Sequence, residues 1–153
     1  MRITFYDTRV TKDYHTMLVK EKSIDYEERI NNPKEIAELM RKILEMDMLG
    51  EEHCYMLALN NKNRILGVFL ISKGTINQSI ISAREVFMRA LLVGASHIIL
   101  CHNHPSQNCT PSNNDFMTTK RFKEAGELMG IPLLDHLIIG GDSYFSFNEA
   151  KML

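Results

Sequence analysis

Apolar residues recur at helical spacing in the segment that follows Asn32. Asn32 is a suitable N-cap, and Pro33 suits the first helical position, where the missing N–H needs no partner. The apolar positions then fall three or four residues apart, at Ile36, Leu39, Met40, Ile43 and Leu44. Residues with this spacing share one face of a helix. The pattern predicts an amphipathic helix here, with Gly50 closing the segment.

Two apolar runs separated by a polar turn come next, in HCYMLALNNKNRILGVFLIS, residues 53–72. The turn contains Asn60, Asn61, Lys62 and Asn63. Short apolar runs joined by an asparagine-rich turn predict a β-hairpin. A further short strand is expected around QSIIS, residues 78–82.

A second helix is expected to begin after Ser82. Ser82 and Glu85 have the spacing of a capping box, in which the two side chains cap the helix reciprocally. The expected buried face consists of Ala83, Val86, Phe87, Ala90 and Leu91, and Gly94 ends the helix. The run SHIILC that follows, residues 96–101, is short and rich in isoleucine, which is typical of a strand covered on both faces.

Thr110 and Pro111 predict the start of a third helix, and Gly130 predicts its end. The inward face of this helix is expected to carry Asp115, Thr118, Phe122, Ala125 and Met129. Two strands are expected after it, in residues 133–140 and 143–147. The order helix, hairpin, helix, strand, helix, hairpin predicts an α/β protein with a mixed β-sheet flanked by helices.

Composition narrows the class of protein. The chain has 153 residues, 44% of them hydrophobic and 24% charged, which is ordinary for a globular protein with a real core. No apolar run is long enough to span a membrane, and the charges in MRITFYDTRV do not fit a signal peptide, so a cytoplasmic location is expected. The net charge of −1 argues against a protein that mainly grips phosphates. Three cysteines without CxxC spacing fit a reduced protein.

The N-terminal segment is the least regular part of the sequence. RITFY resembles a strand, whereas residues 12–30 mix charges with scattered apolar residues. We expect residues 1–31 to form an arm or an extra strand, and residues 32–153 to form one domain.

Candidate metal ligands follow the strand at residues 96–101. His102 and His104 are two residues apart, so both side chains point to the same side of a strand. Asp115 lies one turn into the next helix and faces them if the intervening loop folds back. Two imidazole nitrogens and one carboxylate oxygen leave a fourth tetrahedral position open, which is typical of a catalytic zinc site. These three residues predict a site for one Zn²⁺ ion that lowers the pKa of water toward about 7.

Hydrolysis at such a site also needs a group that takes and returns a proton. Glu51 and Glu52 both stand at the head of the first hairpin strand, and their positions alone do not choose between them. Ser112 precedes Asp115 by three residues, on the same helical face. Its hydroxyl either takes part in the reaction or serves the start of the helix.

These residues carry a resemblance to a known family. His-x-His followed after ten residues by Asp, with Ser three before that Asp, resembles the JAMM (JAB, MPN+) metalloprotease motif. SAREVFMRALLVGASHIILCHNHPS, TPSNND and LLDHLIIGG are similar to the RadC branch of that superfamily. The resemblance implies a cytidine-deaminase-like α-β-α sandwich. It also implies zinc ligands at His102, His104 and Asp115, a general base at Glu52, and an oxyanion-stabilising hydroxyl at Ser112. The implied activity is zinc-dependent hydrolysis of a peptide or isopeptide bond in a protein substrate.

Two departures from the RadC pattern stand out. RadC proteins usually read His-Pro-Ser-Gly-Asp-Pro where this chain has Gln107, Asn108 and Cys109 after the serine, and Cys109 could compete for the metal. The helix-hairpin-helix segment that often precedes the RadC domain is not expected in the first thirty residues. The expectation of DNA binding that the resemblance carries is therefore weakened.

Three other functions remain open at this point. A DNA-processing role follows from the RadC resemblance, although the HNH letters at 102–104 are contiguous, unlike the dispersed residues of HNH nucleases. A non-catalytic scaffold would keep the fold without using the ligands. A zinc deaminase is disfavoured because the H-x-E and P-C-x-x-C signature is missing.

The edges of a mixed sheet leave room for a homodimer. His53, His97 and His136 have no partner at ligand spacing and are interpreted as packing or edge residues.

Overall fold

The computed structural model describes residues 1–26, 31–74 and 81–153. Its elements, in chain order, are β1 (Arg2–Val10), β2 (Thr16–Asp25), α1 (Pro33–Leu44), β3 (His53–Leu59), β4 (Ile65–Lys73), α2 (Ala83–Leu92), β5 (His97–Asn103), α3 (Asn113–Met129), β6 (Leu133–Gly140) and β7 (Ser143–Ser146). The strands form one seven-stranded sheet in the order β2-β1-β4-β3-β5-β6-β7. β1 pairs parallel with β4, and β5 with β6, while the other neighbours are antiparallel. The predicted α/β class with a mixed, helix-flanked sheet is confirmed.

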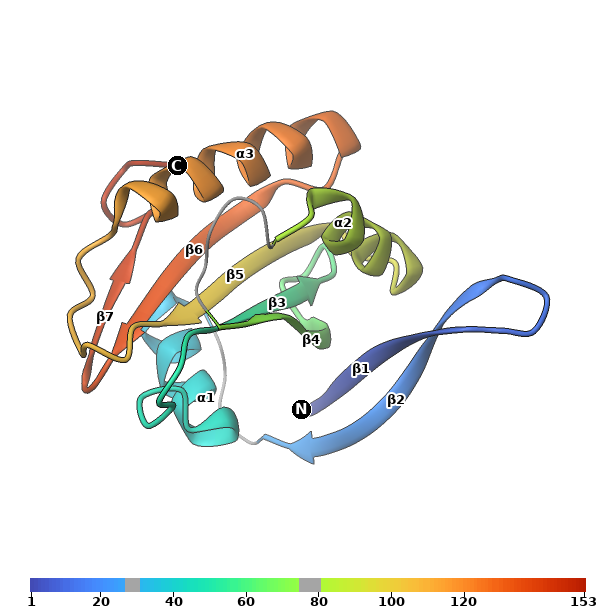
Figure 1. The fold of residues 1–153 in the computed structure, drawn as a ribbon, viewed down its shortest axis with the longest axis horizontal. Coiled ribbons are helices and arrows are strands. Elements are labelled where there is room, and N and C mark those ends of the chain that lie inside the picture. Colours follow the sequence, from blue (N-terminus) through green and yellow to red (C-terminus); the bar gives the residue numbers. More distant parts are fainter. Residues whose placement is uncertain (27–30, 75–80) are drawn as a thin grey trace.

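Alternation of side chains along the central strands produces two hydrophobic cores, one on each face of the sheet. In β5, Ile98 and Leu100 join the core beneath α2 and α3, whereas Ile99 and Cys101 join the core against α1. Figure 1 shows α2 and α3 on one side of the sheet and α1 on the other. Because β5 is buried on both faces, its sequence reads as a continuous apolar run rather than an alternating one.

The start of α1 follows the sequence prediction, and the helix ends at Leu44, the last of the predicted apolar positions. The Asn32 side chain accepts a hydrogen bond from the Glu35 N–H at 2.9 Å, and Pro33 occupies the first turn. The helix ends at Leu44, well before Gly50, because Glu45 adopts the left-handed conformation at φ 50° and its N–H bonds the Arg41 carbonyl. The chain is therefore free to cross the end of the sheet before β3 begins.

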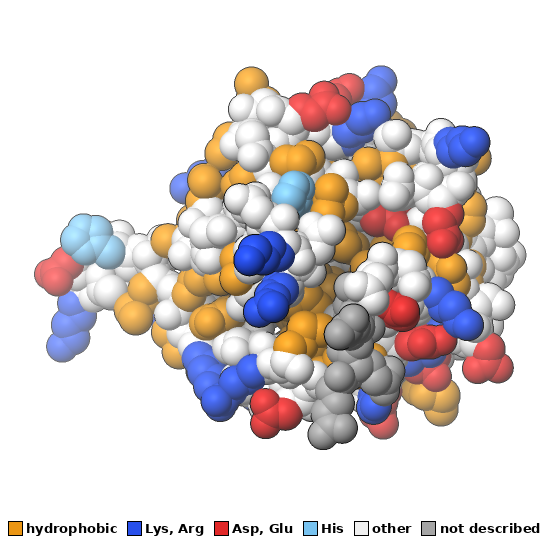
Figure 2. Space-filling view, turned by 180° about the vertical axis from the view of Figure 1, so that it is seen from behind, with side chains coloured by type: hydrophobic (Ala, Val, Ile, Leu, Met, Phe, Trp, Pro, Cys, Tyr) orange, Lys and Arg blue, Asp and Glu red, His pale blue; other side chains and the backbone are white. Residues whose placement is uncertain are grey.

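The N-terminal segment is a hairpin at one edge of the sheet. Ile3 and Phe5 are buried in the α1 core, and Phe5 is the β1 residue paired with Val68 of β4. A register shift between Phe5 and Tyr6 interrupts the ladder with β2. Beyond it the ribbon projects away from the body (Figures 1 and 2), with Lys12 and Asp13 exposed at its tip.

Two side chains predicted to be buried are exposed instead. Leu91 and Met129 have 54% and 43% of their surface exposed, and both line an apolar groove between α2 and α3. In α3 the inward position belongs to Gly126, where a Cβ atom would come within 2.7 Å of the Ile131 carbonyl oxygen. Gly126 thus lets the turn at Ile131 pack closely against the helix, while Met129 stays at the groove between α2 and α3.

The capping box predicted at Ser82 is absent from α2 and present in α3 instead. Ser82 precedes α2 but its side chain makes no capping hydrogen bond, and Glu85 lies 3.9 Å from Arg89. Helix α3 begins at Asn113, with Ser112 rather than Thr110 as its N-cap. The strand expected around residues 78–82 falls mostly outside the described residues. Within the described residues, no helix combines the length and apolar character needed to cross a membrane.

Candidate metal centre

The end of β5 brings two imidazoles to the α3 side of the sheet. His102 continues the row of Ile98 and Leu100, and His104 follows it where the strand leaves the sheet. The two Nε2 atoms lie 3.0 Å apart. His102 is fully buried, whereas the His104 side chain keeps 12% of its surface exposed. His102 therefore lies at the bottom of the site, and His104 lies at its solvent-facing edge.

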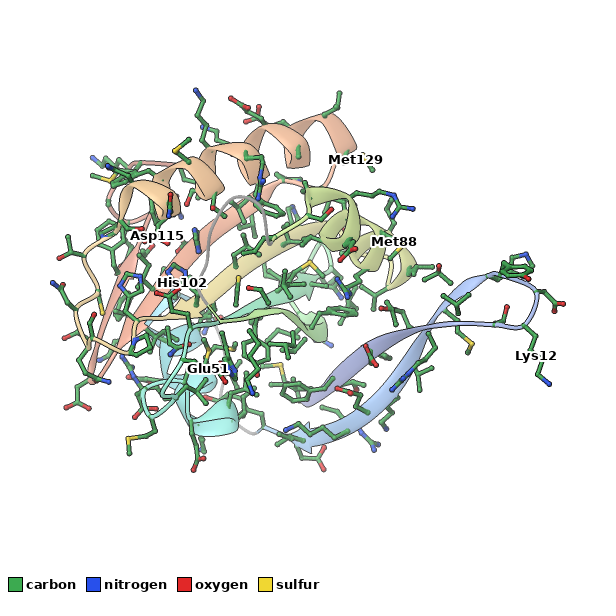
Figure 3. All side chains as sticks on the ribbon, viewed as in Figure 1. Lys12, Glu51, Met88, His102, Asp115 and Met129 are labelled. Atoms are coloured by element: carbon green, nitrogen blue, oxygen red, sulfur yellow. The ribbon has the colours of Figure 1, made fainter. Side chains whose placement is uncertain are left out.

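The first turn of α3 holds the third candidate ligand, Asp115. The Ser112 Oγ accepts a hydrogen bond from the Asp115 N–H at 3.2 Å, while the Ser112 N–H and hydroxyl donate to Asp115 Oδ2 at 2.7 Å each. This capping box fixes the carboxylate and directs Oδ1 at His102, 3.1 Å from its Nε2. In Figure 3 His102 and Asp115 lie beside each other between the sheet and α3.

The three side chains have the spacing of a metal site. One ligand atom each from His102, His104 and Asp115 all lie within 4.8 Å of one another. His102 Nε2 lies 3.0 Å from His104 Nε2 and 3.1 Å from Asp115 Oδ1, while His104 Nε2 lies 3.5 Å from Asp115 Oδ2. Ligands about 2.0–2.1 Å from a tetrahedral metal lie about 3.3 Å apart, so these spacings are close to those around such an ion. Two imidazole nitrogens and a carboxylate oxygen are also the donor types that a divalent metal such as zinc takes.

A buried relay determines which nitrogen of His102 faces the site. The Thr119 hydroxyl donates to the Asp115 carbonyl at 2.7 Å, so its oxygen accepts from His136 Nδ1, also at 2.7 Å. Burial lowers the pKa of His136 well below its ordinary value, so its ring is neutral. His136 Nε2 then accepts from His102 Nδ1 at 2.8 Å. His102 Nε2 is therefore the nitrogen that faces the site, as metal ligation requires.

A second relay orients His104. Its Nδ1 donates to the Asn108 carbonyl at 2.7 Å, which directs Nε2 toward Asp115. The hydrogen bond to Asp115 raises the pKa of His104 despite its partial burial. Burial alone would raise the pKa of Asp115, but hydrogen bonds from His102 and His104 hold it well below its ordinary value. Asp115 is thus a carboxylate, ready to neutralise a cation.

Glu51 and Glu52, which the sequence could not separate, face different surroundings. Glu51 is exposed and pairs with Lys73 at 2.9 Å, and its other near neighbour is His53 at 3.7 Å. Glu52 is partly buried, and its negative charge is among the causes that raise the pKa of His104. Among the described residues, neither acid belongs to the metal-ligand group. Of the two acids, Glu52 is thus the one whose charge acts on the candidate ligand His104.

The cysteines near the site are thiols rather than metal ligands. Burial raises the pKa of Cys54 to about 12, and it also raises the pKa of Cys101 well above its ordinary value. Cys109, which could have competed for the metal, points its Sγ at the Gly140 carbonyl, 3.7 Å away, and burial raises its pKa as well. In the described part of the chain Cys109 stands outside the ligand group.

Sequence reasoning missed His136 and Thr119. His136 has no histidine or acid at ligand spacing and was interpreted as a packing residue. A signal was available, because Asp135 and His136 interrupt an apolar run in LLDHLIIG, and buried polar side chains need partners. Which partner His136 takes depends on the pairing of β6 beside β5, which the sequence did not specify.

Comparison with known proteins identifies the family of the chain. The model of the family described as the RadC-like JAB domain matches residues 30–152. A UPF0758 protein of Clostridium botulinum is 44% identical over 128 residues, which covers 84% of this chain and 55% of that protein. UPF0758 proteins of Clostridium beijerinckii and Desulfitobacterium hafniense are 39% and 42% identical, over 86% and 81% of this chain and 57% and 54% of theirs. The chain thus spans about half the length of these relatives. It belongs to the RadC-like JAB domain family.

Proposed function

We propose that this domain is a metal-dependent hydrolase of peptide or isopeptide bonds and that its metal is zinc. The observation that carries the proposal is the group of His102, His104 and Asp115, whose ligand atoms lie within 4.8 Å of one another with Glu52 close by. Two nitrogens and one oxygen form the ligand set of catalytic rather than structural zinc sites. The JAB superfamily to which the chain belongs includes metallohydrolases, which fits this ligand set.

The residues of the chain divide the chemistry among them. A zinc ion held there would polarise water and lower its pKa toward about 7. Glu52 takes a proton from the attacking water and returns it to the departing amine, as general base and then general acid. Ser112 lies next to Asp115 and stabilises the oxyanion once its hydroxyl turns away from Asp115 Oδ2. Until then the serine serves as the helix cap.

The first experiment compares wild type with His104→Ala and Glu52→Gln. Metal content is measured by plasma mass spectrometry, and hydrolysis is measured on mixed fluorogenic peptides and on isopeptides linked through the lysine ε-amine. We expect about one zinc per chain in wild type and in Glu52→Gln, and little in His104→Ala. Glu52→Gln should lose about 10²–10⁴-fold in turnover, the usual contribution of a general base.

Controls and contrary outcomes are well defined. His15→Ala, in the projecting hairpin, should keep both zinc and activity. Full turnover by Glu52→Gln would remove Glu52 from the mechanism. Wild type that refuses zinc at micromolar concentration would point to a non-catalytic scaffold. Metal-dependent nicking of plasmid DNA that is lost in His104→Ala would point to a nuclease instead.

A further inference from the structure

Asn103, which stands between the two candidate ligands, serves the opposite face of the sheet. His102 points toward α3, so Asn103, one residue on, points toward the α1 side, where it is 1% exposed. Its Oδ1 accepts a hydrogen bond from the His53 N–H at 2.8 Å. Its Nδ2 donates to the Glu51 carbonyl at 3.1 Å and to the Leu49 carbonyl at 3.5 Å. Leu49 and Glu51 belong to the connection between α1 and β3, and His53 is the first residue of β3.

The two shorter hydrogen bonds of Asn103 go to the residues on either side of Glu52. Asn103 donates to the carbonyl of Glu51 and accepts from the N–H of His53. The Glu52 carbonyl also accepts from the Gly74 N–H at 2.8 Å. The backbone of Glu52 is therefore fixed on both sides by a side chain that belongs to the ligand strand itself. Movement of β5 relative to this segment would break these partly buried hydrogen bonds.

An asparagine side chain suits this position for a chemical reason. A carboxamide offers one oxygen acceptor and two N–H donors, and here the oxygen meets an N–H while the nitrogen faces two carbonyls. An aspartate has no N–H to donate to Glu51, and a serine is too short to reach both partners. The buried amide has its hydrogen-bonding capacity satisfied, as buried polar groups must.

A second amide extends the same attachment. Gln107, in the loop after His104, adopts φ 64° and donates from Nε2 to the Asp47 carbonyl at 3.1 Å. The loop bearing the metal ligands is thus tied to residues 47–53 at both ends of that segment. Gln107 is exposed, so the buried Asn103 contributes the stiffer attachment.

We propose that Asn103 is the positioning residue for Glu52, holding that acid at a fixed place relative to His102 and His104. The role rests on the proposed function, because positioning matters for catalysis only if Glu52 moves the proton. It goes beyond the ligand set, since the hydrogen bonds of Asn103 to the described residues all go to backbone atoms of Leu49, Glu51 and His53. Outer residues that orient a catalytic group typically change activity by about 10–100-fold.

The test compares Asn103→Ala, Glu52→Gln and the double variant in the full chain. Crystals of the zinc-free proteins give the position of Glu52 relative to His104. Hydrolysis of p-nitrophenyl acetate by the zinc-loaded proteins gives kcat and KM. We expect Asn103→Ala to displace Glu52 while His102, His104 and Asp115 stay in place. Its kcat should fall about 10–100-fold with little change in KM, and the double variant should be no slower than Glu52→Gln.

Asn60→Ala is the matched control. Asn60 accepts two backbone hydrogen bonds, from Lys62 and Arg64, in the β3–β4 turn at the far end of the strands. Its loss should lower the melting temperature without changing kcat or the position of Glu52. If Asn103→Ala does not fold, Asn103→Ser, which leaves room for a bridging water, carries the same comparison.

The outcomes separate the two proposals. If Glu52 stays in place in Asn103→Ala and only the melting temperature falls, Asn103 is merely structural and the inference is overturned. If Glu52 moves but Glu52→Gln hydrolyses the ester as fast as wild type, the positioning role stands and the proposed function fails. A wild type without ester hydrolysis also counts against the proposed function, and the crystals alone then decide the role of Asn103.

Discussion

At the scale of single residues, the site depends on side chains that no ligand motif contains. His136 is fully buried and neutral, and it links the Thr119 hydroxyl to His102 Nδ1 through hydrogen bonds of 2.7 and 2.8 Å. Such partners fix the tautomer and the ring orientation of a metal-binding histidine. A residue on β6, behind the candidate ligand, would thus contribute to the affinity of the proposed zinc site.

Replacing His136 should weaken zinc binding without removing a ligand. In His136→Ala, His102 Nδ1 loses its acceptor and the ring is free to turn or change tautomer. We expect the zinc dissociation constant, measured by competition with a chromophoric chelator, to rise about 10–100-fold.

Thr119 supplies the matched pair of controls. Thr119→Ser keeps the hydroxyl and should bind zinc like wild type, whereas Thr119→Val keeps the volume but breaks the relay. An unchanged dissociation constant in both His136→Ala and Thr119→Val would contradict the relay.

At the scale of elements, the start of α3 serves stability and ligation at once. The hydrogen bonds that cap the helix are the same ones that direct the Asp115 carboxylate at His102. Removing the Ser112 cap should therefore lower both the stability of the protein and the affinity for a metal. Removing an ordinary helix cap should lower only the stability.

Ser112→Ala and Asn32→Ala test this difference. Both side chains cap a helix by accepting an N–H three residues on. Each substitution should lower the free energy of unfolding by about 1 kcal/mol, or about 2–4 °C in melting temperature. Only Ser112→Ala should also weaken zinc binding, by about tenfold. Equal zinc affinity in the two variants would show that the cap does not orient the ligand.

The sequence predicted most of the elements because their signals are local. The N-cap at Asn32, the hairpin of β3 and β4, and the buried strand β5 all depend on neighbours within a few residues, and all three are present. The exposed Leu91 and Met129 were predicted wrongly, because the packing of α2 and α3 leaves a groove between the two helices that both side chains line, and helical spacing alone does not show such a groove.

The residues of the site also fall into those that local sequence spacing predicts and those that depend on distant parts of the chain. His102, His104 and Asp115 could be proposed from spacing on a strand and on the following helix. The partners His136 and Asn103 could not, because each depends on which strand or connection lies beside β5. The choice of Glu52 over Glu51 came from resemblance, and the ion pair of Glu51 with Lys73 supplies a physical reason for it.

At the scale of the whole molecule, the sheet joins the N-terminal hairpin to the region that matches the RadC-like family. The RadC-like match begins at residue 30, whereas β1 contributes Ile3 and Phe5 to the core against α1. The base of the N-terminal hairpin therefore belongs to the same core as the strands that carry the site. Binding of zinc at the end of β5 should accordingly stabilise the protein as a whole, by mass action on the folded state.

This stabilisation should depend on pH through His104. Its raised pKa means that the proton on His104 stabilises the zinc-free protein below the unfolded value of about 6.5, an effect lost as pH rises through the folded value. Asp115, with a lowered pKa, contributes stability that is present above its unfolded value of about 3.9 and is lost as pH falls through the folded value. Their ion pair is strongest between about pH 4 and 6.5, where zinc must displace a proton from His104.

The rise in melting temperature caused by zinc should therefore be larger at about pH 8 than at about pH 5.5, at equal free zinc. At about 100 times the dissociation constant, zinc adds about 2.7 kcal/mol to the free energy of unfolding. Thermal scans with buffered zinc and with chelator measure the difference at each pH. His104→Ala should lose the zinc effect at both pH values, and His15→Ala should keep it. A zinc effect of equal size at the two pH values would mean that no proton leaves the site when the metal binds.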